Sequence, residues 1–287
     1  MSDLHAGAPT PLGPDQAARA LHALATDPAR GPVLLALDFD GTLAPLQDDP
    51  QASRLLPAAA VALRDLARHP ARIRLALVSG RAVADLDHLA EVPVGTLLVG
   101  SHGAERARVT AHGLDRDEVR LTADQADRLD RLGRELQGIA RGRDGVWVET
   151  KPTAAVVHTR LADDPVADQA ETEALAVGAR LGSTVLHGKD VVEISVLDAD
   201  KGVALTGLRA EVGAGAVVYA GDDVTDEHAF AALLPGDLAI KVGPGATLAG
   251  YRLADPVALT ALLTALAADL SGAQGDGTEG RGPRAAG

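Results

Sequence analysis

Short aliphatic runs alternate with amphipathic segments along most of the 287-residue chain. Four of the runs end in Gly, Ser or Asp, as buried parallel strands often do, and they cover residues 33–38, 73–79, 96–100 and 216–221. Apolar positions at i, i+3 and i+4 predict helices over residues 15–25, 57–68, 83–90 and 257–270. This alternation predicts an α/β fold with a mainly parallel central sheet.

The middle of the chain has a different order of elements. It reads as two helices and four strands, with helices over 123–140 and 167–181 and strands over 145–150, 154–160, 184–187 and 191–196. We therefore expect an α/β module inserted into the first one. The predicted divisions are a tail and helix over 1–30, core over 31–105, inserted module over 106–196, core again over 197–270, and a disordered tail over 271–287.

Composition narrows the classes of function. The formal net charge is −13, which argues against a nucleic-acid binder that relies on general attraction to phosphates. Cysteine is absent, which excludes disulfides and thiolate sites, and no stretch reaches the ~20 apolar residues of a membrane span. We expect a cytoplasmic monomer without nucleic-acid or membrane partners. Lysine is scarce against arginine, and the only lysines are Lys151, Lys189, Lys201 and Lys241.

Two acidic residues follow the first aliphatic run directly, in the motif Asp38-Phe39-Asp40-Gly41-Thr42. The carboxyl ends of parallel strands are where open α/β sheets bind ligands. Two buried carboxylates at one strand end repel each other, and a hard cation such as Mg²⁺ relieves that repulsion. The turn at Gly41 and Thr42 offers a hydroxyl and backbone N–H groups that could hold a phosphate.

A second acidic cluster follows the run 216–220, beginning with Gly221-Asp222-Asp223. Asp222 and Asp223 come directly off the strand and are expected to complete a metal site with Asp38. Asp226 and Glu227 fit partly as acids at a helix N-terminus, where they favour the helix dipole.

Two weaker signals lie between these clusters. Ser79 and Arg81 follow a strand end, where a hydroxyl and a helix N-terminus suit phosphate oxygens. Lys201 begins a helix after the inserted module. Each of these alone is more often an ordinary helix cap.

Taken in their order along the chain, these motifs resemble those of the haloacid-dehalogenase-like phosphatase superfamily. Within it, the chain resembles the trehalose-phosphatase family, through the segments GSHGAE at 100–105, GKDVVE at 188–193 and GDDVTDE at 221–227 as well as the core motifs. The resemblance spans roughly residues 33–270. It implies a Rossmann-like parallel-sheet core with an inserted α/β cap.

The resemblance also implies a reaction: hydrolysis of trehalose 6-phosphate to trehalose and phosphate, the last step of trehalose biosynthesis. Asp38 would be the nucleophile that forms an aspartyl-phosphate, and Asp40 the general acid and base. Ser79 and Lys201 would bind the phosphoryl oxygens. Mg²⁺ would be held by Asp38, Asp222 and the Asp40 backbone carbonyl, with Asp223 in support.

Sugar recognition is expected mainly from the cap. The candidate substrate-binding residues are Gly41, Thr42, Arg81, His102, Glu105, Glu149, Lys151, His158, Arg160, Lys189 and Glu193. A solvated edge-strand face would carry similar charges, so each cap candidate also fits a role without ligand. Trp147, the only tryptophan, is expected in the cap core rather than as a platform for stacking a sugar.

Three alternatives stay open at this point. A related phosphatase could act on another phosphosugar, such as a sucrose phosphate or mannosyl-phosphoglycerate, with the same core and a different cap. A non-catalytic phosphosugar sensor or regulatory partner of a synthase would not need both Asp38 and Asp40. A phospho-acceptor receiver domain also clusters Asp, Ser or Thr, and Lys, but the DxDGT motif and the long insertion argue against it.

Overall fold

The computed structural model describes residues 10–47, 49–118, 121–181, 184–188, 190–197 and 200–275. The described residues form two compact units, one within residues 1–116 and 200–287 and the other within residues 117–199. The expected α/β core with an inserted α/β module is confirmed. Among the described residues, no helix combines the length and apolar character that a membrane crossing requires.

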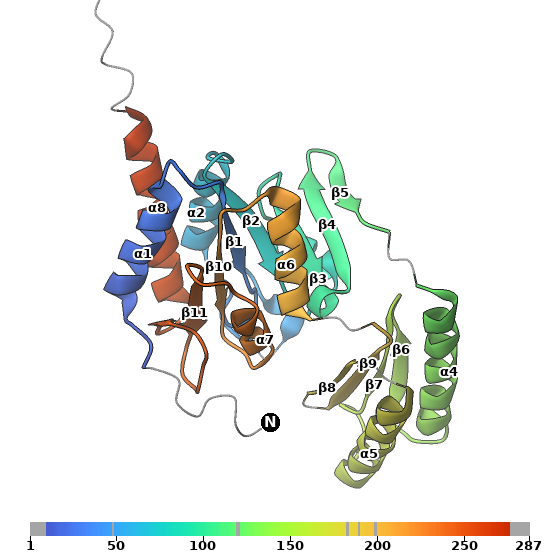
Figure 1. Ribbon diagram of the computed structural model, residues 1–287. Coiled ribbons are helices and arrows are strands. Elements are labelled where there is room, and N and C mark those ends of the chain that lie inside the picture. Colours follow the sequence, from blue (N-terminus) through green and yellow to red (C-terminus); the bar gives the residue numbers. More distant parts are fainter. Residues whose placement is uncertain are drawn as a thin grey trace, which may run out of the picture. The chain divides into compact units, whose positions relative to one another are not determined.

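An eight-stranded sheet forms the centre of the first unit (Figure 1). Its spatial order is β12 (Tyr251–Leu253), β11 (Leu238–Val242), β10 (Ala216–Gly221), β1 (Val33–Leu37), β2 (Ile73–Val78), β3 (Leu97–Gly100), β4 (Glu105–Thr110) and β5 (Gly113–Arg116). The strands from β12 to β3 pair in parallel, whereas β4 and β5 pair antiparallel. The strands β1 and β10 lie side by side, which brings the two acidic motifs together.

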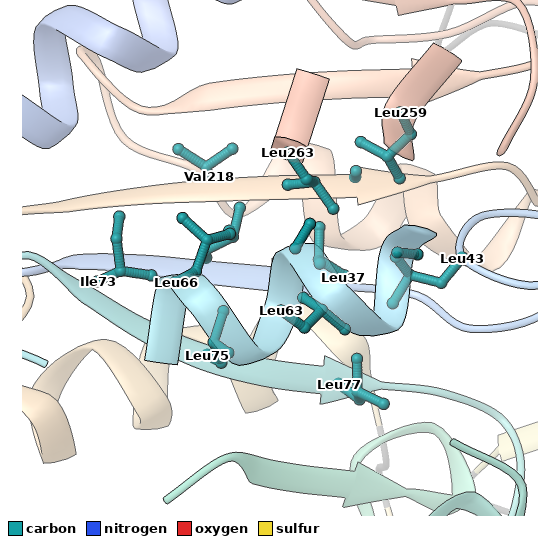
Figure 2. Close-up of a cluster of buried hydrophobic side chains, with 14 of the residues drawn as sticks. Leu37, Leu43, Leu63, Leu66, Ile73, Leu75, Leu77, Val218, Leu259 and Leu263 are labelled. Atoms are coloured by element: carbon teal, nitrogen blue, oxygen red, sulfur yellow. The ribbon is translucent and has the colours of Figure 1, made fainter. Parts of the chain in front are cut away.

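Helices cover both faces of this sheet because successive residues of the buried strands point to opposite sides. One face packs on α1 (Pro14–Thr26), α2 (Pro57–Ala67), α3 (Val83–Ala90) and α8 (Pro256–Gly275). Figure 2 shows this layer, with Leu63 and Leu66 of α2 near Leu37, Leu75 and Leu77. The other face packs on α6 (Lys201–Val212) and α7 (Thr225–Ala231). Two short 3₁₀ turns, η1 (Pro50–Ala52) and η2 (Ser101–Gly103), lie in the loops.

The second unit has a smaller antiparallel sheet of β6 (Trp147–Thr150), β7 (Ala154–His158), β9 (Val191–Ser195) and β8 (Thr184–Gly188), in that spatial order. The helices α4 (Ala123–Ala140) and α5 (Asp164–Leu181) pack on one face of it. Their core is aliphatic and joins Leu132 and Leu136 of α4 to Val157 and Ile194 of the sheet.

The boundary of the inserted unit differs from the expected one at 106. The strands β4 and β5 extend the central sheet, so the second unit begins at residue 117 and ends at 199. Ala107 is buried in the first unit's core, while Arg106 and Arg108 alternate with it. This polar alternation is typical of a strand near a sheet edge and hides its membership in the core.

A smaller correction concerns the C-terminal end of the core. The helix α8 continues to Gly275, past the expected tail boundary at 271, and residues 276–287 lie outside the described part. Near the other end, Leu12 pairs with Tyr251 next to the sheet edge. Residues 1–9 also lie outside the described part.

Candidate active site

The carboxyl ends of β1, β2 and β10 surround a cavity of about 600 Å³. The strand order explains this assembly, because β1 lies between β2 and β10 and all three run in the same direction. The predicted site residues that line the cavity are Asp38, Asp40, Ser79, Arg81, His102, Lys201, Asp222 and Asp223. Residues more than 180 positions apart in the sequence thus meet at one sheet edge.

Asp38 lies at the floor of this site and is 5% exposed. Its backbone N–H donates to the Ala220 carbonyl at 2.9 Å, which continues the β1–β10 ladder by one residue. The Lys201 ammonium donates to Asp38 Oδ1 at 2.9 Å. Burial and the neighbouring Asp226 and Asp222 raise the pKa of Asp38, against the opposing effect of Lys201.

Lys201 is also buried and has a second carboxylate partner, Asp226 Oδ1, at 2.7 Å. The same Asp226 oxygen accepts the Tyr219 hydroxyl at 2.6 Å, and Oδ2 accepts the Asp223 backbone N–H at 2.8 Å. Burial lowers the pKa of Lys201, but the two carboxylates outweigh burial and raise it above its usual value. Lys201 therefore stays an ammonium next to Asp38.

The Asp38 carboxylate belongs to a group of three carboxylates that lie close together. Among the described residues, Asp38, Asp222 and Asp226 bring carboxylate oxygens within 4.8 Å of one another. Burial and the acids Asp226 and Asp223 raise the pKa of Asp222, although Thr42 and Lys241 oppose this. A hard divalent cation fits this donor set. Its charge offsets the repulsion among the three carboxylates that the single ammonium of Lys201 does not neutralise. Asp226 already accepts three hydrogen bonds, so Asp38 and Asp222 are the freer ligands.

Asp223, expected to support the metal, lines the cavity but is not one of the three grouped carboxylates. Asp223 is exposed, and its Oδ1 accepts the Val224 backbone N–H at 2.6 Å. Asp226, which we expected partly as a helix N-terminal acid, takes its place in the three-carboxylate group. The reason is geometric: Asp226 lies in the first turn of α7, which folds back over the end of β10.

Asp40 has three donors around its carboxylate. Arg81 Nε donates to Oδ2 at 2.5 Å and Arg81 Nη2 donates to Oδ1 at 2.7 Å, while Ser53 Oγ donates to Oδ1 at 2.9 Å. The Arg81 guanidinium also lies over the Phe39 ring, 5.6 Å from its centroid. Arg81, expected as a phosphate-binding residue, thus binds the expected general acid, and Ser53 was not foreseen.

Gly41 and Thr42 are used within the protein. The Gly41 N–H donates to Ala44 O at 2.8 Å, and the Thr42 hydroxyl donates to Asp222 Oδ1 at 2.9 Å. A Cβ on Gly41 would lie 2.1 Å from Asp222 Oδ2, and its φ of +74° is unfavourable for other residues. Their expected role in binding phosphate stays a prediction, while in the structure Thr42 bonds Asp222 and Gly41 leaves room for its carboxylate.

The loop after β3 lies against the Ser79 turn. The His102 N–H donates to Ser79 O at 3.0 Å, and a Cβ on Gly80 would lie 2.5 Å from the His102 ring. The Ser79 hydroxyl accepts the Arg81 N–H at 3.2 Å, but the N-cap of α3 is Ala82 and not Ser79. Glu105, whose expected binding of substrate stays a prediction, accepts the Ser101 hydroxyl at 2.5 Å and the Val83 N–H at 3.4 Å.

Lys241 is a site residue that the sequence motifs did not reveal. It is 4% exposed in β11, and its ammonium donates to the Asp222 backbone carbonyl. The only sequence signal for it was the scarcity of lysine in an arginine-rich chain. Tyr219, Ser53 and Asp226 were similarly missed as partners of the predicted residues.

Four of the six sugar-binding candidates in the second unit lie in two pairs. Lys151 donates to Glu193 Oε2 at 2.7 Å, and His158 Nε2 is 3.0 Å from Glu149 Oε2. Arg160 is exposed in a turn after β7, because that strand ends at His158 and not at residue 160 as expected. Lys189 lies outside the described residues. Trp147 is 40% exposed, so its expected place in the cap core is wrong.

Fold and site together are of the haloacid-dehalogenase-like class, with a strand-end Asp pair, a buried Lys and an acidic cluster on the neighbouring strand. The trehalose-phosphatase family model matches residues 36–256. The chain belongs to the trehalose-phosphatase family.

Several known proteins are similar to this chain. A trehalose-phosphate phosphatase of Mycobacterium marinum is 34% identical over 245 residues, which cover 82% of this chain and 61% of the relative. An uncharacterised glycosyl hydrolase of Mycobacterium tuberculosis is 35% identical over 247 residues, which cover 82% of this chain but 18% of that protein. A solved trehalose-6-phosphate phosphatase of Aspergillus fumigatus is 25% identical, with a TM-score of 0.65 over 92% of this chain and 100% of the other. The chain therefore spans less than two thirds of these curated relatives.

Proposed function

We propose that this chain is a Mg²⁺-dependent phosphatase that releases phosphate from trehalose 6-phosphate, the last step of trehalose biosynthesis. The observation that carries the proposal is the buried Lys201–Asp38 pair at 2.9 Å in a cavity that Asp40, Ser79 and Asp222 also line. Family membership and the trehalose-phosphate phosphatase relatives support the choice of substrate.

Asp38 is the proposed nucleophile. One of its carboxylate oxygens forms a bond to phosphorus while the bond from phosphorus to the sugar oxygen breaks, which gives an aspartyl-phosphate. Lys201 orients Asp38 through Oδ1 and offers positive charge to the phosphoryl oxygens. Ser79, buried beside the cavity, is the proposed hydroxyl partner of another phosphoryl oxygen.

Asp40 is the proposed general acid and base. It gives a proton to the departing sugar oxygen, then takes one from the water that attacks the aspartyl-phosphate and so restores Asp38. Arg81 engages both Asp40 oxygens, so one of these hydrogen bonds has to break before the proton transfer. A phosphate group entering the cavity competes for Arg81, which releases Asp40 for its role.

Asp38 and Asp222 are the proposed carboxylate ligands of Mg²⁺, together with the Asp40 backbone carbonyl and with Asp223 in support. Lys201 and Tyr219 hold Asp226 next to them. When bound, Mg²⁺ supplies charge that offsets the phosphate dianion and the acids around it. Two hydrogen bonds hold Asp222 in place. The Thr42 hydroxyl donates to its carboxylate, and the Lys241 ammonium donates to its backbone carbonyl.

The proposed sugar-binding residues of the second unit are Glu149, Lys151, His158, Arg160, Lys189 and Glu193. Carboxylates accept hydrogen bonds from sugar hydroxyls and ammonium groups donate to them. The Lys151–Glu193 and His158–Glu149 pairs support this proposal, because each offers a donor and an acceptor side by side.

Phosphate release from a panel of phosphosugars tests the proposal. We expect trehalose 6-phosphate to be turned over with a kcat/KM at least about tenfold above sucrose 6-phosphate and mannosyl-phosphoglycerate, a difference of ~1.4 kcal/mol in transition-state binding. A preference for another phosphosugar would contradict the substrate. Binding of trehalose 6-phosphate without turnover would instead favour a sensor.

A further inference from the structure

The second unit has one sheet face that its own described helices leave free. Val157 and Ile194 point to the aliphatic core under α4 and α5. Residues on these strands alternate, so the neighbouring positions Trp147, His158 and Glu193 belong to the opposite face. We call this the open face of the small sheet. On this face Val156 is 2% exposed, whereas Trp147 of the edge strand β6 is exposed and lies among charged groups, which is unlike a protein core.

Trp147 is the feature of this face that needs an explanation. It is the only tryptophan of the chain and is 40% exposed, whereas Tyr219 and Phe39 are fully buried. Its ring is stacked on His158, with centroids 4.7 Å apart and planes 11° apart. His158 is in turn 3.0 Å from Glu149, so the stack has a fixed polar partner. The indole is therefore oriented by its neighbours while much of it stays accessible.

We propose that Trp147, oriented by His158, is a stacking platform for a neutral sugar ring on the open face of the small sheet. This inference rests on the proposed function and names a specificity residue for it. The apolar C–H face of a pyranose packs on an indole, while hydroxyls at the ring edge need donors and acceptors beside it. Glu149, Lys151 and Glu193 supply them within the same face.

The charges of this face favour a sugar over a nucleotide. Its described ionisable groups are the two carboxylates Glu149 and Glu193, the ammonium of Lys151, and His158. Lys151 is paired with Glu193 at 2.7 Å, so this pair leaves no surplus positive charge for a phosphate between β6 and β9. An uncharged ring rich in hydroxyls meets no repulsion from the carboxylates. The open face thus suits the sugar part of a phosphosugar.

The single tryptophan makes a direct binding test possible, since Trp emission reports on Trp147 alone. We expect trehalose, titrated into the full chain, to change the emission in a saturable way, and maltose and sucrose to do so less. A flat response to all three disaccharides, or a response to adenosine in their place, overturns the platform.

Kinetics provide the second measurement. Trp147→Ala should raise KM for trehalose 6-phosphate about tenfold with kcat nearly unchanged, and Trp147→Phe should recover part of the loss. Leu161→Ala is the matched control, because Leu161 is 76% exposed in the same unit but lies in the turn after β7. A Trp147→Ala chain with the KM of the unmodified chain overturns the inference and leaves the proposed function intact. Conversely, an emission response to trehalose without phosphate release would support the platform and contradict the proposed function.

Discussion

Lys201 and Asp226 form an ion pair of 2.7 Å in which both side chains are almost fully excluded from solvent, at 3% and 0% exposure. Lys201 makes a second pair with Asp38 at 2.9 Å, so a single ammonium stands between two buried carboxylates. Charged groups are costly to bury without partners, and each of these three depends on the others. The cluster therefore has consequences for both stability and catalysis.

Replacement of Lys201 tests that dependence. Lys201→Met should lower kcat at least about 10³-fold, because the phosphoryl oxygens lose their buried cation. It should also destabilise the fold by about 3–5 kcal/mol, since Asp38 and Asp226 are left close together without it. Lys201→Arg is the matched variant, and we expect it to restore the positive charge but little activity. The single Lys201 nitrogen donates to both Asp38 and Asp226, and a planar guanidinium does not fit that position. Phosphate release and urea unfolding measure the two effects, and a Lys201→Met chain with near-normal kcat would contradict the assigned role.

Glycine at position 41 allows the close approach of Asp222. Gly41→Ala should abolish most activity because a Cβ would lie 2.1 Å from the Asp222 carboxylate. Gly95→Ala provides the control, since Gly95 also has positive φ but nothing within 4 Å of its Cβ position. It should cost about 1 kcal/mol of stability through backbone strain and leave kcat unchanged. Equal losses of activity in the two variants would show that strain, and not crowding of Asp222, is responsible.

Lys241 is expected to act through Asp222. Its ammonium holds the Asp222 backbone carbonyl and opposes the raised pKa of that carboxyl group. Lys241→Met should weaken Mg²⁺ binding about tenfold, measured by calorimetry on the full chain, and shift the Mg²⁺ dependence of activity by the same factor. Lys241→Arg should restore part of the affinity. An unchanged Mg²⁺ affinity in Lys241→Met would reduce Lys241 to a packing role.

The lowered pKa of Asp237 predicts how the free energy of unfolding depends on pH. Burial raises the pKa of Asp237, but bonds from Arg209 at 2.6 and 2.9 Å and from the N–H groups of Val217 and Leu234 outweigh burial and lower it. A lowered pKa in the folded chain stabilises the fold above the unfolded value of about 3.9, and this contribution is lost as the pH falls through the folded value. Asp237→Asn should therefore be less stable at pH 7, with a difference that shrinks below about pH 4. Urea unfolding across this range measures it, and a difference independent of pH would contradict the assignment.

Much of the fold was predictable from the chain because its strands are short, aliphatic and bounded by Gly, Ser or Asp. The starts of β1, β2 and β10 were predicted at the residues where the structure has them. The antiparallel strand β4 was not assigned to the core, since Arg106 and Arg108 give it the composition of a surface segment. Trp147 was misplaced for a related reason: residue type predicts average burial, while sheet register decides which face a side chain occupies.

The same distinction applies to the site. Motif residues such as Asp38 and Ser79 were found because strand ends converge in a parallel sheet, and Lys201 was found through the family resemblance. Their partners depend on local geometry that spacing does not specify. Arg81 hydrogen-bonds Asp40 rather than standing free. Asp226 folds back over the end of β10, while Asp223 is exposed at the cavity.

The most direct test of the central claim is phosphate release from trehalose 6-phosphate by the unmodified chain and by Asp38→Asn, each with Mg²⁺ and with a chelator. The account predicts turnover only in the unmodified chain with Mg²⁺, because Asn cannot form the aspartyl-phosphate and is a poorer metal ligand. Asp38→Asn that folds normally and keeps turnover would contradict the account, as would full activity of the unmodified chain in chelator.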